Sequence, residues 1–232
     1  MADSASVDFH PRFTITRFGN FGRLFRSPDS EFERSIARLS VLYEDLYLEV
    51  VGAGMEKGIA PQLEPFGPAY RSCYFLRRAV ATALEVKDVI DQILVTREFR
   101  RIEVEAKSSQ DVHYKRDWVP AVEFFKENRK LLKTVRDDVG GHFGDGAAKK
   151  ALTLVADDYC ASIEIQSDVD GRVRLLLPFA TELAASALLA NVPGATVECQ
   201  LQSLVLLLGK AVECTVDVVH FLGEAVLWKR LG

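Results

Sequence analysis

The sequence lacks the features that mark several protein classes. Its 232 residues hold only four cysteines (Cys73, Cys160, Cys199, Cys214), with no Cys-x-x-Cys pair and no histidine at zinc-finger spacing. Unpaired thiols of this kind are typical of a reducing compartment. We therefore expect free cysteines in a cytoplasmic protein, with no disulfide framework, no metal and no cofactor.

Long uncharged apolar runs and an excess of basic residues are also missing. The most apolar stretch, residues 199–231, is interrupted by charges such as Lys210 and Asp217, and no run reaches the ~18 apolar residues that a membrane span requires. Residues 1–13 carry two aspartates and no apolar core of a signal peptide. With 29 basic and 33 acidic residues the net charge is −4, so any nucleic-acid contact must be local. These patterns predict a chain without membrane or secretory segments.

What the sequence does contain is helical periodicity. Apolar residues recur every three or four positions in several segments, which predicts amphipathic helices. The predicted helices cover residues 27–51, 69–105, 117–139, 147–156, 178–190 and 197–231. Two β-rich runs on either side of a glycine-containing turn predict one hairpin over about 162–177. We therefore expect an all-α protein: an up-and-down helical bundle with one small β-hairpin insertion, forming a single domain over 27–232 after an N-terminal arm at 1–26.

The predicted helix over 117–139 has one basic and one apolar side. Lys126, Arg129, Lys130 and Lys133 gather on one side of the helical wheel, with Glu127 as the only acid between Lys126 and Arg136. A solvated polar face is the common interpretation of such a charge run, and a phosphate-binding surface is the alternative. The opposite, apolar side could pack in the core of the monomer or form a dimer surface.

The end of this helix carries a recognisable pattern. Arg136-Asp137 is followed, after four residues, by His142, and a diglycine precedes that histidine. This arrangement resembles the signature of the HEPN superfamily (higher eukaryotes and prokaryotes nucleotide-binding), in which an arginine, a neighbouring polar residue and a histidine recur at a helix end. The resemblance is specific over about 118–143 and only architectural elsewhere.

The resemblance implies a metal-independent endoribonuclease of the toxin–antitoxin or phage-defence type, active as a homodimer in which two motifs face one cleft. Arg136 and His142 would be catalytic and Asp137 would assist, while the RNA would contact the basic side of the helix. The chemistry is reasonable, because histidine can move protons near neutral pH and the arginine fork matches phosphate oxygens.

The sequence also supports a second hypothesis, a non-catalytic helical bundle that binds a protein or nucleotide partner. The other histidines are weak candidates for a functional site. His113 is expected on a surface loop, and His220 is expected to be a core residue of an apolar helix. No set of metal-binding carboxylates and histidines is expected from their spacing.

Overall fold

The computed structural model describes residues 25–27, 29–54, 67–139, 145–155, 164–167 and 173–231. Its helices are α2 (Glu31–Gly54), α3 (Gly67–Val95), α4 (Arg97–Ser108), α5 (Val119–Val139), α6 (Asp145–Leu154), α7 (Pro178–Leu189), α8 (Val197–Leu222) and α9 (Trp228–Leu231). Two π-helical segments, η2 (Tyr114–Trp118) and η3 (Gly223–Leu227), precede α5 and follow α8. The predicted all-α helical bundle is confirmed.

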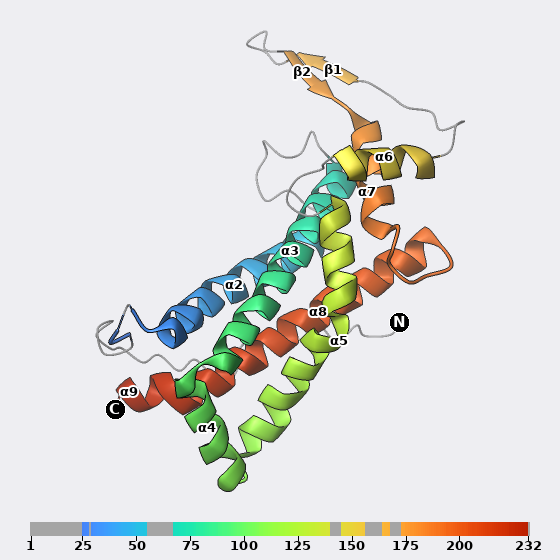
Figure 1. The fold of residues 1–232 in the computed structure, drawn as a ribbon. Helices are drawn as coiled ribbons and strands as arrows, with labels where there is room; N and C mark the ends of the chain where they lie inside the picture. Colours follow the sequence, from blue (N-terminus) through green and yellow to red (C-terminus); the bar gives the residue numbers. More distant parts are fainter. Residues whose placement is uncertain are drawn as a thin grey trace, which may run out of the picture.

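The long helices form the body of the molecule. In Figure 1, α3 runs back along α2, and α8 packs across both, while α5 packs against α3 and α8. The largest fully buried side chains are aromatic and come from α4, η2, α5 and α8; they are Phe99, Trp118, Phe125 and Phe221. The core of the bundle therefore extends to the end at which α4 meets η2.

A small sheet lies at the other end of the bundle, beyond α6 and α7 (Figure 1). Its two strands, β1 (Glu164–Ser167) and β2 (Val173–Leu176), pair antiparallel with Gln166 opposite Arg174. They correspond to the hairpin predicted over about 162–177. The predicted N-terminal arm falls outside the described residues, except for its last two positions.

The first helix begins later than predicted. The helix predicted to begin at residue 27 starts at Glu31, and the Ser30 hydroxyl accepts a hydrogen bond from the Glu33 N–H at 3.3 Å. The Glu33 carboxylate accepts the Ser27 N–H at 2.8 Å and pairs with Arg230 at 2.9 Å, which ties the end of the chain to α2. Burial raises the pKa of Glu33, but the Ser27 N–H and the Arg230 charge outweigh burial and lower it overall.

The single helix predicted over 69–105 is wrong, because the chain breaks it at Thr96. The Thr96 hydroxyl donates to the Ile93 carbonyl at 2.7 Å and accepts the Phe99 N–H at 3.3 Å, so it ends α3 and caps α4. Neither glycine nor proline marks this point in the sequence. The break turns α4 away from the axis of α3 (Figure 1), and it brings Phe99 against Trp118 with 4.5 Å between ring centroids.

The thiols of the described cysteines are free. Cys73 and Cys214 are buried and Cys199 is exposed, while Cys160 lies outside the described residues. Burial raises the pKa of both Cys73 and Cys214 to about 11, which leaves these two thiols protonated and unreactive at neutral pH. Across the described helices, none combines the length and the apolar content that crossing a bilayer would take.

Candidate functional site

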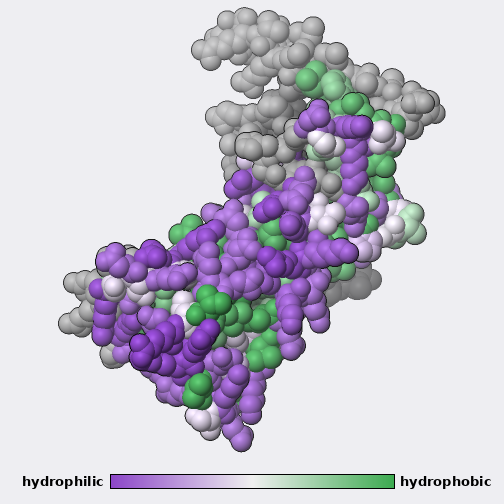
Figure 2. Space-filling view, in the orientation of Figure 1, coloured by the Kyte–Doolittle hydropathy of each residue, from purple (hydrophilic) through white to green (hydrophobic). Residues whose placement is uncertain are grey.

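The basic side of α5 is exposed along its whole length. We call the four side chains Lys126, Arg129, Lys130 and Lys133 the α5 basic face; all four are exposed. None of them forms an ion pair with another residue in the part of the chain that the structure describes. Figure 2 shows hydrophilic residues over much of this side of the bundle, including the part where α5 runs in Figure 1.

The apolar side of α5 is buried inside the monomer. Phe125, Leu132 and Val135 are each at most 1% exposed and belong to the hydrophobic core. The polar Asn128 on this side donates its amide N–H to the Phe124 carbonyl at 2.9 Å, which satisfies it within the helix. Of the two interpretations that the sequence left open for this side, core packing is correct. A dimer surface there is excluded for these three residues.

The catalytic motif predicted from the sequence is only partly described. Arg136 lies in the last turn of α5, and its guanidinium Nη2 pairs with the Asp137 carboxylate at 2.8 Å. Both side chains reach solvent, with exposed fractions of 37% for Arg136 and 50% for Asp137. His142, the third predicted catalytic residue, lies outside the described residues. Arg136 and Asp137 are therefore together, and whether His142 faces them stays a prediction.

A second group of polar side chains gathers where η2 meets α8. We call His113, Asp117 and His220 the histidine cluster. The Asp117 Oδ2 atom lies 2.9 Å from His113 Nδ1 and 3.6 Å from His220 Nδ1. The two imidazole rings meet edge to face with 5.1 Å between their centroids. His220 Nε2 lies 4.0 Å from a carboxylate oxygen of Glu224.

Arg116 completes the surroundings of Asp117. Its Nε and Nη2 atoms contact the two carboxylate oxygens at 2.6 and 3.0 Å, and Nη2 also lies 3.2 Å from His113 Nδ1. Asp117 is 6% exposed, whereas the Arg116 side chain is 63% exposed. The Arg116 hydrogen bonds outweigh the effect of burial and, with help from His113, lower the pKa of Asp117 to about 2. Burial and the charge of Asp117 raise the pKa of the neighbouring Asp217.

Two irregular helical turns lie next to this cluster. Asp117 lies in the π-helical turn η2, where the Val119 N–H bonds to the Tyr114 carbonyl five residues back. His220 lies in the last turn of α8, three residues before the second π-helical turn, η3, begins at Gly223, and η3 contains Glu224. Single π-helical turns are rare, and they occur frequently at functional sites. One such turn precedes α5 and the other follows α8, so the region around the histidine cluster differs from the regular helices.

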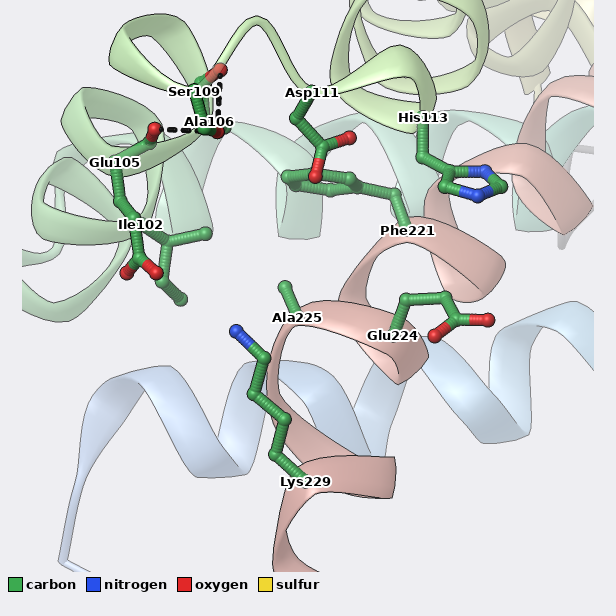
Figure 3. A pocket seen from close by; sticks show the side chains of 10 residues that line it. All are labelled: Ile102, Glu105, Ala106, Ser109, Asp111, His113, Phe221, Glu224, Ala225 and Lys229. Carbon is green, nitrogen blue, oxygen red and sulfur yellow. Dashed lines mark hydrogen bonds between the residues drawn. The ribbon is translucent and has the colours of Figure 1, made fainter.

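A polar pocket adjoins the histidine cluster (Figure 3). It has a volume of about 210 Å³ and lies between α4 on one side and η3 with α9 on the other. Its polar lining includes the acids Glu105, Asp111 and Glu224 and the base Lys229. His113 also lines it, above Glu224 in Figure 3, so the pocket gives a small ligand access to the edge of the cluster.

The sequence did not predict the histidine cluster. His113 was expected in a surface loop, but it lies in a helical turn, half-buried beside Asp117. His220 was expected to be a core residue, but its side chain is 38% exposed and faces two carboxylates. The spacing of His113 and Asp117, four residues apart, does suggest one helix face. No spacing pattern could add His220, which comes about a hundred positions later.

Comparisons with known protein families, with curated proteins and with solved structures find no match for this chain.

Proposed function

We propose that this chain binds RNA through the α5 basic face and cleaves it without a metal ion, as a homodimer of the toxin or phage-defence type. The observation that supports the proposal is the exposure of Lys126, Arg129, Lys130 and Lys133 without an anionic partner within the described part of the chain. Cations without an internal partner can bind phosphate without first breaking an ion pair.

The length of the α5 basic face suits a short stretch of nucleic-acid backbone. From Lys126 to Lys133 an α-helix rises roughly 10 Å. Measured along the axis of a duplex, the phosphates of one strand follow one another every ~3.4 Å, so the face spans about three of them along that axis. The chain is acidic overall, with a net charge of −4, and this favours a small, local contact over an extended RNA track.

The proposed reaction uses the residues at the end of α5. The 2′-hydroxyl of the RNA would attack the adjacent phosphorus, with His142 taking the hydroxyl proton. The Arg136 guanidinium would stabilise the negative charge that develops on the phosphate oxygens. Asp137, whose carboxylate lies 2.8 Å from Arg136 Nη2, would hold the guanidinium in one orientation. The RNA strand breaks when the 5′-oxygen leaves and takes up a proton from water, and the products are a 2′,3′-cyclic phosphate and a 5′-hydroxyl.

A second candidate function is a non-catalytic module that binds a nucleotide or a protein partner. The Arg136–Asp137 pair favours it, because a guanidinium that is already paired with a carboxylate gives less stabilisation to a phosphate. Under this alternative the α5 basic face would still bind an anionic partner, and Arg136 would keep a structural role.

Cleavage of RNA in EDTA tests the proposal. Full-length protein is incubated with a fluorescently labelled single-stranded RNA, and with DNA of the same sequence as a substrate that lacks the 2′-hydroxyl. We expect cleavage of the RNA alone, and a loss of at least about 100-fold in rate for Arg136→Ala and for His142→Ala. Light scattering of the purified protein measures whether it is a dimer.

Two variants separate the candidate functions. Lys130→Ala/Lys133→Ala removes two charges from the α5 basic face, and Lys149→Ala/Lys150→Ala removes the same number of charges from α6 as a control. RNA binding that falls only in the first variant, without cleavage by the wild type, supports the non-catalytic module. Cleavage that persists in both Arg136→Ala and His142→Ala refutes the proposed catalytic residues.

A further inference from the structure

The histidine cluster has the composition and spacing of a metal site. Two imidazoles and one carboxylate are a common ligand set for divalent first-row transition metals. The three ligand atoms lie within 4.8 Å of one another. Bonds of about 2.0–2.1 Å to one ion place neighbouring ligand atoms about 3 to 3.5 Å apart. The distances from Asp117 Oδ2 to the two histidine nitrogens, 2.9 and 3.6 Å, are close to that range.

The position of Arg116 gives independent evidence that this point attracts a cation. One guanidinium nitrogen, Nη2, lies 3.0 Å from Asp117 Oδ2 and 3.2 Å from His113 Nδ1, so it contacts two of the three ligand atoms. The side chain is 63% exposed and can turn into solvent without leaving a cavity. Arg116 thus supplies a positive charge at the place where a metal ion would supply one.

We propose that His113, Asp117 and His220 bind one divalent transition-metal ion, for which Zn²⁺ is the probe, and that the Arg116 guanidinium competes with this ion. The ion binds when the guanidinium turns away from Asp117 and His113. Three protein ligands leave one position of a tetrahedral ion open to water or to a further ligand.

The surroundings supply what such a site needs beyond its ligands. His220 Nε2 lies 4.0 Å from a carboxylate oxygen of Glu224, and this exposed side chain can move into hydrogen-bond distance when His220 binds through Nδ1. A carboxylate behind a ligating histidine orients the ring and strengthens the ligand. The polar pocket beside His113 gives an access path, and its acids Glu105, Asp111 and Glu224 outnumber Lys229, which favours the approach of a cation.

Metal binding would also join two distant parts of the chain. His113 and Asp117 lie at η2, and His220 lies at the end of α8. An ion bound by all three side chains binds the folded state far better than the unfolded one, so it raises the midpoint of thermal unfolding. This shift is a readout that does not depend on any catalytic activity.

The test uses the full chain without a histidine tag, treated with EDTA and then freed of it. Calorimetric titration with Zn²⁺ should show one ion per chain, and Co²⁺ should give a visible absorption band. We expect His113→Ala and His220→Ala each to weaken Zn²⁺ binding at least about tenfold and to lose the thermal shift. We expect Arg116→Gln to tighten Zn²⁺ binding at least about threefold, because the competing charge is gone.

Control variants separate a specific loss of Zn²⁺ binding from a loss of folding. His10→Ala removes one imidazole from elsewhere in the chain and should bind Zn²⁺ like the wild type. His113→Gln and His220→Gln replace the alanine variants if circular dichroism shows that those do not fold. Wild-type protein that binds no Zn²⁺, or histidine-cluster variants that bind it as the wild type does, would overturn the proposal. Weaker binding by Arg116→Gln would overturn the competition with Arg116.

Because the proposed RNA cleavage takes place in EDTA, its failure and the failure of the metal site are distinguishable. His142→Ala should lose cleavage and keep Zn²⁺ binding, whereas His113→Ala should lose Zn²⁺ binding and keep cleavage in EDTA.

Discussion

The chain contains two Arg-Asp dipeptides, and the fold gives them different environments. In both, the arginine reaches the carboxylate of the next residue: Arg116 contacts Asp117 at 2.6 Å and Arg136 contacts Asp137 at 2.8 Å. Asp117 is 6% exposed, whereas Asp137 is 50% exposed. The same two residue types therefore form a buried, shared anion in one place and a solvated pair in the other.

The difference in burial determines whether a new ligand must replace an existing partner. Asp117 is surrounded by partners, since Arg116, His113 and His220 all approach it, and a new ligand must replace one of them. Near Arg136 the α5 basic face has cations without a partner among the described residues, and a phosphate can add to them directly. Substitutions at the first region should therefore alter stability, and those at the second should alter only binding.

The largest effect should come from the aromatic support of the histidine cluster. Trp118 follows Asp117 and packs on Phe99 and Phe221, with 4.5 and 5.3 Å between ring centroids. Trp118→Ala leaves a cavity at the meeting point of α4, η2 and α8, and it should lower the free energy of unfolding by about 3–5 kcal/mol. Urea denaturation measures this. Tyr74→Ala, which removes a 50% exposed aromatic ring, should change stability little, and an equal loss there would contradict the comparison.

The next prediction applies one substitution to both dipeptides. Asp117→Asn removes the charge that Arg116 and His113 share, and we expect it to lower the free energy of unfolding by about 1–3 kcal/mol. Asp137→Asn removes the matching charge from a solvated pair and should leave stability almost unchanged. Both are measured by urea denaturation in EDTA at pH 7. Equal losses in the two variants would show that burial does not distinguish the two pairs.

A smaller, pH-dependent effect should come from the link between α2 and the end of the chain. Because the folded-state pKa of Glu33 is lowered, its contribution is present above the ordinary glutamate pKa of ~4.3 and is lost as the pH falls through the folded value. Glu33→Gln should cost about 1 kcal/mol at pH 7, and the difference from the wild type should shrink as the pH falls below the ordinary glutamate pKa. Denaturation curves at several pH values test this, and a difference that grows toward low pH would contradict it.

The smallest effect on stability, and a clear one on binding, should come from the α5 basic face. Each lysine that contacts a phosphate of single-stranded RNA adds ~0.7 to the slope of log K against log salt concentration. Lys130→Ala/Lys133→Ala should lower that slope by roughly 1.4, with an unchanged midpoint of thermal unfolding. Fluorescence anisotropy at several salt concentrations measures the slope. A slope that changes equally in Lys149→Ala/Lys150→Ala would mean that the contact is not specific to α5.

The regular part of the fold could be predicted from the sequence because its signals are local. The periodicity of α2, α5 and α8 is visible over a few turns, and so is the separation of basic and apolar sides on α5. The break at Thr96 could not be predicted, because a buried hydroxyl and its contacts with Ile93 and Phe99 cause it, with no glycine or proline nearby. The π-helical turn η3 left no mark on the helical pattern either.

The helical class, the charge of α5 and the arginine and aspartate at its end can all be read from the sequence, because each depends on residues within a few turns. Which Arg-Asp pair is buried and which histidines meet depend on how distant helices pack. His113 and His220 come together because η2, which follows the break after α3, packs against α8. That convergence depends on packing between distant segments, which no local pattern records.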